Sequence, residues 1–252
     1  MARAEVVRPH ILAIDDTPIN LTVLAKALEA EFTVQIAFSG AEGLAMASAV
    51  PPQLVLLDIM MPEMDGYETC RRFKSDPKLA HIPIVFISAL TDGVSEIRGL
   101  ELGAEDYLFK PIKMDIAKQR IRNLLERKRA LEYEKFYRKM LELLVSGKAM
   151  LDILVAIVVG LENLRPEMMC SIMLLDHSSR FLGKCIAPSL PDAFNQAIAG
   201  LKLDLSWISD AISASGGRAT LLHIAGQPQW ESLKNSAAAC DLVACWLQPI
   251  HA

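Results

Sequence analysis

Residues 54–66 read LVLLDIMMPEMDG, and this stretch decides how the first half of the chain is interpreted. Its first four residues are all apolar, without alternation, as in a parallel strand that helices cover on both faces. Asp58 follows the apolar run directly, and the stretch closes on Asp65-Gly66, a pair typical of a turn in which glycine relieves backbone strain. The pattern predicts a buried strand over residues 54–57 that carries a carboxylate at its end.

Four further apolar runs surround this strand, and helical periodicity fills the segments between them. The resulting alternation of strands and helices predicts an α/β fold with a doubly wound, five-stranded parallel sheet. In such sheets functional groups gather at the carboxyl ends of the strands. The other four strands are expected at residues 11–14, 33–37, 84–87 and 107–109.

Three carboxylates fall at that edge, because Asp15 and Asp16 end the first predicted strand and Asp58 ends the third. Carboxylates gathered in this way repel one another and resist ionisation. Mg²⁺ relieves such repulsion, since it binds through few carboxylates and accepts phosphoryl oxygens. Lys110, after the fifth strand, adds a positive charge. Asp58 is the natural nucleophile toward phosphorus, forming an acyl phosphate.

The same residues resemble the receiver domain of two-component response regulators over roughly residues 8–125. The resemblance implies a flavodoxin-like fold, with Asp58 accepting a phosphoryl group from a histidine kinase or a phosphotransfer protein. It also implies a Mg²⁺ site in which Asp16, Asp58 and the Met60 carbonyl bind the ion directly and Asp15 acts largely through water. The matching residues are Asp15-Asp16, Asp58 through Gly66, Ser88-Ala89, Tyr107 and Lys110-Pro111.

The resemblance further implies how a phosphoryl group would be held and sensed. Lys110, Ser88 and Ala89 would bind it, and the peptide bond before Pro111 would be cis. Ser88 would be the switch hydroxyl, and the Tyr107 ring would follow its movement. Structural alternatives exist for each: Asp16-Thr17-Pro18 is also an ordinary helix start, Lys110 can simply end a strand, and a lone Ser or Tyr is more often structural.

A long helix is expected over residues 112–144, which contain no Pro or Gly and are rich in Lys, Arg, Glu and Leu. It would link a receiver domain at 1–125 to a second domain at 146–252, with residues 112–145 as the linker. An apolar stripe at coiled-coil spacing predicts dimerisation along this helix, although Lys128 interrupts it and the stripes on either side are out of phase. They consist of Ala117, Ile121, Leu124 and Leu131, and of Tyr133, Tyr137, Met140 and Leu144.

The second half starts with a helix near 149–161 and strands at 169–175 and 180–187, and continues with a helix, a strand and a helix before an end at 243–250. Residues 170–176, 187–195 and 245–250 resemble a GAF domain, an α+β fold, over about 142–252. Two departures matter. Residues 207–211, WISDA, stand where many relatives carry a glycine-serine-cysteine-glycine segment, and further strands would follow Pro249-Ile250. We therefore expect an incomplete GAF-like domain, cut from a longer protein.

Composition excludes several classes of protein. A net charge of −4 and a pI near 5.8 oppose nucleic-acid binding, so the basic segment 118–139 is read as a solvated helix face. No apolar stretch could span a membrane or act as a signal. Five cysteines without a CxxC pair oppose disulfide or zinc sites and favour the cytoplasm. Cys240 and Cys245 are expected in a core.

The sequence thus predicts a response regulator that relays phosphorylation of Asp58 through a long helix to a GAF-like sensory or dimerisation module. We find no motif of a dedicated enzyme. Two alternatives remain. The chain could be the N-terminal regulatory part of a larger signalling enzyme, a cyclic-dinucleotide cyclase or phosphodiesterase or a histidine kinase, or it could be a scaffold that is never phosphorylated. The intact set Asp15, Asp16, Asp58 and Lys110 argues against the scaffold.

Overall fold

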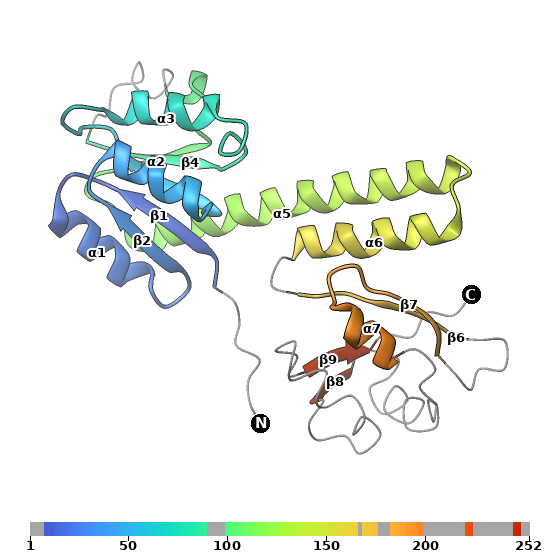
Figure 1. Cartoon of the computed structure of the whole chain (residues 1–252). Helices are drawn as coiled ribbons and strands as arrows, with labels where there is room; N and C mark the ends of the chain where they lie inside the picture. The colour runs from blue at the N-terminus through green and yellow to red at the C-terminus, as the bar shows by residue number, and fades with distance from the viewer. Residues whose placement is uncertain are drawn as a thin grey trace. The chain divides into compact units, whose positions relative to one another are not determined.

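The structure is a computed structural model that describes residues 8–89, 99–165, 168–175, 182–198, 220–223 and 244–247. The chain divides into two compact units, Met1–Leu131 and Glu132–Ala252 (Figure 1). Each unit is therefore described by itself. Within the described ranges, every helix is too short or too polar to cross a bilayer.

The first unit contains a five-stranded sheet in which all neighbouring strands run parallel, in the order β2-β1-β3-β4-β5. Each predicted strand agrees with an observed one to within one residue, so the predicted five-stranded parallel sheet is confirmed. The strands are β1 (His10–Ile14), β2 (Thr33–Ala37), β3 (Leu54–Asp58), β4 (Ile84–Ser88) and β5 (Asp106–Phe109).

Both faces of this sheet are covered, because successive side chains of a strand point to opposite sides. On one side, Leu12 and Val55 pack with residues of α2 (Gly40–Ala49) and α3 (Gly66–Ser75). On the other side, Ile11 and Leu54 pack with residues of α1 (Pro18–Leu28) and α5 (Met114–Val145). The absence of alternation in residues 54–57 therefore reflects burial on both faces (Figure 1).

The first apolar stripe of α5 belongs to this core. Ala117 and Ile121 are fully buried and Leu124 packs against the same cluster, whereas Leu131 is 49% exposed. The expectation that Ala117, Ile121 and Leu124 lie on a dimer seam is therefore wrong, because the sheet of their own unit covers them. A helix stripe at coiled-coil spacing also fits packing against a sheet.

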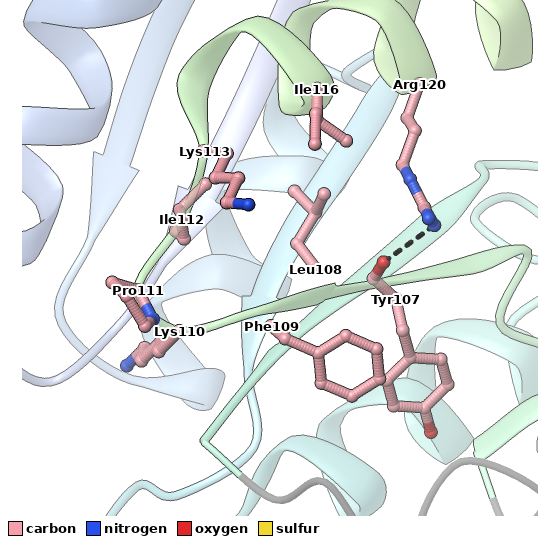
Figure 2. A pocket seen from close by; sticks show the side chains of 9 residues that line it. All are labelled: Tyr107, Leu108, Phe109, Lys110, Pro111, Ile112, Lys113, Ile116 and Arg120. Carbon is pink, nitrogen blue, oxygen red and sulfur yellow. Dashed lines mark hydrogen bonds between the residues drawn. The ribbon is translucent and has the colours of Figure 1, made fainter.

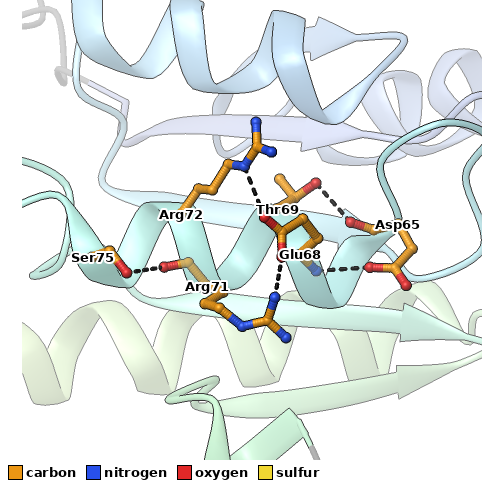
Figure 3. Close-up of polar contacts among 6 residues, drawn as sticks. All are labelled: Asp65, Glu68, Thr69, Arg71, Arg72 and Ser75. Atoms are coloured by element: carbon orange, nitrogen blue, oxygen red, sulfur yellow. Dashed lines mark hydrogen bonds and ion pairs between the residues drawn. The ribbon is translucent and has the colours of Figure 1, made fainter.

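The turn expected at Asp65-Gly66 is the start of α3. Asp65 is the N-cap, and its Oδ1 accepts a hydrogen bond of 2.7 Å from the Glu68 N–H (Figure 3). Glu68 in turn pairs with Arg71 and Arg72 on the next turn of the helix.

Gly66 is needed for space rather than for strain relief. The described glycines with positive φ are Gly103 and Gly147, so Gly66 has an ordinary backbone conformation. A Cβ at Gly66 would overlap the Asp58 carbonyl oxygen and lie 2.7 Å from the Ile59 Cα. The Gly66 N–H donates to the Ile59 carbonyl at 2.9 Å. The start of α3 is therefore pressed against the end of β3.

The second unit contains the end of α5, α6 (Met150–Leu164), α7 (Asp192–Ile198) and two antiparallel strand pairs. The end of α5 and α6 lie side by side, with the Phe136 ring against Gly160 and with Met140 and Val158 buried (Figure 1). The strands pair as β6 (Ile172–Leu175) with β7 (Leu182–Ile186), and β8 (Thr220–His223) with β9 (Ala244–Leu247).

The two predicted helices, at 112–144 and 149–161, are found at α5 and α6. β6 begins at Ile172, three residues later than the strand expected from 169. The last predicted helix, residues 207–211, Cys240 and Pro249-Ile250 lie outside the described residues, as does the side chain of Cys245.

Replacing Gly66 by Ala is expected to lower the free energy of unfolding by about 2 kcal/mol, because the new methyl group meets backbone that cannot move aside. Urea denaturation followed by circular dichroism measures the change. Gly43→Ala is the matched control, since the nearest atoms to its Cβ would belong to the Ile14 side chain rather than to the backbone. Equal losses in the two variants would contradict this explanation of Gly66.

Candidate functional site

The structure brings Asp15, Asp16 and Asp58 together at the carboxyl edge of the sheet. Asp15 and Asp16 follow β1, Asp58 ends β3, and one carboxylate oxygen of each lies within 4.8 Å of the others. Asp15 and Asp58 are each 3% exposed, whereas Asp16 is exposed. The order β1-β3 places the two buried carboxylates on adjacent strands.

The Lys110 ammonium bridges these two buried carboxylates. Its Nζ lies 2.9 Å from Asp58 Oδ1 and 3.2 Å from Asp15 Oδ2. Lys110 follows β5 directly, and its backbone N–H donates to the Ser88 carbonyl at 2.8 Å. The peptide bond between Lys110 and Pro111 is cis, as the resemblance implied.

Asp15 is also held by neutral donors. Its Oδ1 accepts from the Thr17 N–H at 2.8 Å, and its two oxygens accept from the Asn20 side-chain amide at 3.1 and 3.0 Å. Asn20 was missed by sequence reasoning. The signal available was a polar residue in the first turn of a helix that starts immediately after the carboxylate pair.

Asp16 is not the cap of α1. Thr17 is the N-cap residue, its side chain makes no capping hydrogen bond, and Pro18 is the first helical residue. The helix start predicted at Asp16-Thr17-Pro18 is therefore confirmed, with Pro18 in the first turn, but the expected capping side chain is not found. The exposed Asp16 carboxylate lies in the cluster.

Burial raises the pKa of Asp58, because a charged carboxylate is poorly solvated there. The charge of Asp15 acts in the same direction, whereas the hydrogen bond from Lys110 opposes it. Burial also disfavours the charge on Lys110, but the hydrogen bonds and charges of Asp58 and Asp15 outweigh it and raise the Lys110 pKa. The charge of Lys110 is therefore favoured, yet this single ammonium does not fully offset the cost of ionising Asp58 beside Asp15.

The cluster suits a hard divalent cation. Its donors are all carboxylate oxygens, which Mg²⁺ prefers, and the exposure of Asp16 leaves room for the waters that Mg²⁺ retains. Three ionised carboxylates beside one ammonium leave two negative charges, which a divalent cation would neutralise. The residues present therefore fit the ion.

The loop between β3 and α3 is tightly wound beside this cluster. Glu63 has a φ of 64°, unusual for a residue with a side chain, and the Met64 N–H donates to the Pro62 carbonyl at 2.7 Å across it. Met60 lies in the same loop, and its side chain is 64% exposed. Backbone strain of this kind often accompanies functional loops.

Ser88, Ala89 and Tyr107 lie on the neighbouring strands. Ser88 ends β4, 1% exposed, one residue beyond Ile87, the partner of Asp58 in the sheet, and Ala89 follows it at the surface. Tyr107 is 3% exposed, and its ring centroid lies 5.2 Å from that of Phe86 and 6.4 Å from that of Phe109. Figure 2 shows the Phe109 ring beside it.

Residues 11–122 match the model of a family described as response regulator receiver domain. Over 120 residues, 48% of this chain, the sequence is 39% identical to a probable cyclic di-GMP phosphodiesterase of Vibrio cholerae. It is 45% identical over 116 residues, 46% of this chain, to the response regulator PleD of Caulobacter vibrioides. These matches span only 27% and 26% of the two relatives.

A crystal structure of the signal receiver domain of a signal transduction histidine kinase from Syntrophus aciditrophicus is also similar. It is 34% identical, with a TM-score of 0.44, and the match covers 47% of this chain and 90% of that one.

The raised pKa of Asp58 predicts that, without divalent cations, Asp58→Asn is more stable than the wild type at neutral pH. The folded state binds the Asp58 proton more tightly than the unfolded state does, so stability is lost as pH rises from the ordinary carboxyl range through the raised pKa. The advantage of the variant should therefore grow from pH 4 to pH 8.

Urea denaturation in EDTA across that pH range measures this effect. Glu101→Gln, which neutralises an exposed carboxylate, is the control and should show no comparable trend. A stability difference between Asp58→Asn and wild type that does not change with pH would mean that ionisation of Asp58 is not penalised.

Proposed function

Because residues 11–122 form a response regulator receiver domain, we propose that this protein accepts a phosphoryl group on Asp58 from a histidine kinase or a phosphotransfer protein. The observation that carries the proposal is the position of Asp58. Its carboxylate is buried at a sheet edge, 2.9 Å from the Lys110 ammonium and within 4.8 Å of two further carboxylates. An aspartate with a purely structural role would not need an ammonium and two further carboxylates this close.

The transfer is a displacement at phosphorus. An Asp58 carboxylate oxygen forms a bond to phosphorus as the P–N bond of a phosphohistidine breaks, and the imidazole nitrogen keeps the electron pair and takes up a proton. Asp15, Asp16, Asp58 and the Met60 carbonyl would hold Mg²⁺, which supplies neutralising charge for the transferring group. Lys110 orients the nucleophile and remains beside the phosphoryl oxygens, with Ser88 at the end of β4 and Ala89 directly after it.

In this proposal a donor protein approaches the cluster along α1. A cavity of about 350 Å³ next to the cluster is lined by Asp15, Asn20 and Lys110 and by apolar residues of α1. Two of these, Ile19 and Val23, are 70% and 55% exposed. This apolar surface beside the polar cleft would be the docking surface for a donor protein whose phosphohistidine reaches Asp58.

We further propose that Ser88 and Tyr107 respond to the phosphoryl group and that α5 carries the change to residues 146–252, a GAF-like sensory or dimerisation module. In this proposal residues 1–125 are the receiver domain and 112–145 the linker helix. The support is that β5 and α5 are joined at the site itself, through Lys110 and Pro111.

A homodimer through the second unit is part of this proposal. With Met140 buried, an exposed stripe of α5 consists of Tyr137, Leu141 and Leu144, which are 65%, 62% and 62% exposed. On the adjacent helix α6, Val155 and Val159 are 40% and 39% exposed. Two such helix pairs could bury these side chains against each other as a four-helix bundle.

A second candidate is the regulatory N-terminal part of a larger signalling enzyme. It is favoured by the similarity to a protein called a probable cyclic di-GMP phosphodiesterase, of which the match spans 27%. The sequence of the gene beyond the codon for Ala252 distinguishes the candidates, because an enzyme would continue into a catalytic domain.

The proposed function predicts a phosphoryl adduct, detected by intact mass spectrometry, after incubation of the protein with acetyl phosphate and Mg²⁺. Asp58→Asn should lose the adduct completely, and EDTA should suppress it in the wild type. Asp65→Asn is the matched control, because Asn also caps helices and Asp65 lies outside the cluster.

An adduct of equal yield in Asp58→Asn would place the acceptor elsewhere. If the wild type formed none with acetyl phosphate or with a phosphorylated histidine donor, the protein would be the non-phosphorylated scaffold.

The proposed dimer predicts that the double variant Leu141→Glu/Leu144→Glu has half the molar mass of the wild type in light scattering after size exclusion. Charged side chains at these positions would have to be buried unpaired in the interface. Val50→Glu, at a similarly exposed position in the first unit, should leave the mass unchanged. A wild type that is already monomeric at micromolar concentration would rule out this interface.

A further inference from the structure

The inward position of the Tyr107 ring depends on the absence of a side chain at residue 99. Gly99 is buried and helical. A Cβ there would coincide with the Tyr107 hydroxyl oxygen, and it would lie 2.7 Å from the Tyr107 Cζ and 2.8 Å from the Phe86 Cε2. Glycine weakens a helix relative to alanine. The position of the Tyr107 ring explains why a glycine is nevertheless found here.

The backbone at Gly99 is held in place and cannot easily give way. The Ala104 N–H donates to the Gly99 carbonyl at 3.2 Å and the Gly103 N–H to the Leu100 carbonyl at 3.0 Å, which ends the helix in a Schellman motif. Gly103 adopts the required φ of 91°. Two residues further on, the Glu105 side chain is fixed by bonds from the Ile84 N–H at 2.6 Å and the Lys74 ammonium at 3.1 Å.

The ring of Tyr107, by contrast, can move without its backbone. Arg120 fixes the strand through a bond to the Tyr107 carbonyl at 3.0 Å (Figure 2) and through a second bond to Asp106 at 2.5 Å. A cavity of about 280 Å³ opens beside Tyr107, lined by Phe109, Ile116 and Arg120 among others. Rotation of the side chain toward this space would leave β5 unchanged.

We propose that Gly99 is the positioning residue for Tyr107: the missing side chain is what allows the ring to lie inward, and any side chain at residue 99 drives the ring outward. The regulatory meaning of this movement rests on the proposed function, in which Tyr107 follows the state of Asp58. Gly99 then sets the balance between the two ring positions in the unphosphorylated protein.

The test is the nitration of individual tyrosines by tetranitromethane, mapped by mass spectrometry, in wild type and Gly99→Ala without any phosphodonor. Tyr67, 6% exposed, and Tyr137, 65% exposed, are internal references for slow and fast reaction. In the wild type, Tyr107 should react as slowly as Tyr67, and in Gly99→Ala its rate should move toward that of Tyr137. Leu100→Ala, at an exposed neighbouring position, should leave Tyr107 protected.

A double-mutant cycle covers the case in which Gly99→Ala destabilises the fold. Gly99→Ala should lower the urea midpoint clearly in the wild-type background and much less in the Tyr107→Ala background, where the Tyr107 ring is absent and only the Phe86 ring is approached. Protection of Tyr107 in Gly99→Ala, or equal destabilisation in both backgrounds, would overturn the proposal. Neither measurement involves Asp58, so failure of phosphorylation would leave this result intact.

Discussion

The structure of the first unit depends on the burial of two carboxylates, those of Asp15 and Asp58, around the Lys110 ammonium. Burying charge is costly unless it is paired, and here the pairing requires three strands to end at the same edge. The parallel sheet satisfies this requirement, because β1, β3 and β5 deliver their last residues to one side. Stability is given up for a site with residual negative charge, which makes a divalent cation a suitable ligand. The positive charges of that cation and of Lys110 would in turn favour a phosphoryl group.

The packing around Asp58 connects this charge to distant side chains. Gly66 presses α3 against the Asp58 carbonyl, and the next residue, Tyr67, meets Phe86 edge-on with centroids 5.4 Å apart. Phe86 in turn contacts Tyr107. Close-packed rings of this kind do not deform gradually, so a response needs an element with two discrete positions. Tyr107 can be that element, since the backbone on either side of its ring is anchored and a cavity adjoins it.

Much of this could be predicted from sequence because burial on both faces leaves a strong signal. The runs at 11–14 and 54–57 have few alternative explanations, and carboxylates directly after such strands must meet. What could not be predicted depends on contacts between segments far apart in sequence. Three contacts of this kind become visible only in the three-dimensional structure. They are the hydrogen bond from Asn20 to Asp15, the overlap that forbids a Cβ at Gly66, and the packing of the Tyr107 ring against Gly99. The sequence therefore predicted a turn at Gly66, whereas the role of Gly66 is to let the start of α3 approach the end of β3 closely.

The same limit explains the phase break in α5. The sequence shows two apolar stripes that do not align, so they cannot form one continuous coiled-coil seam. In the structure the helix contributes to two buried regions in succession: Ala117 and Ile121 pack against the sheet, Phe136 packs against Gly160 of α6, and Met140 is buried. Periodicity reports that a face is buried but not what buries it. The interruption at Lys128 therefore lies between the two buried stretches, and Leu141 and Leu144 beyond it are exposed side chains that the proposed dimer would cover.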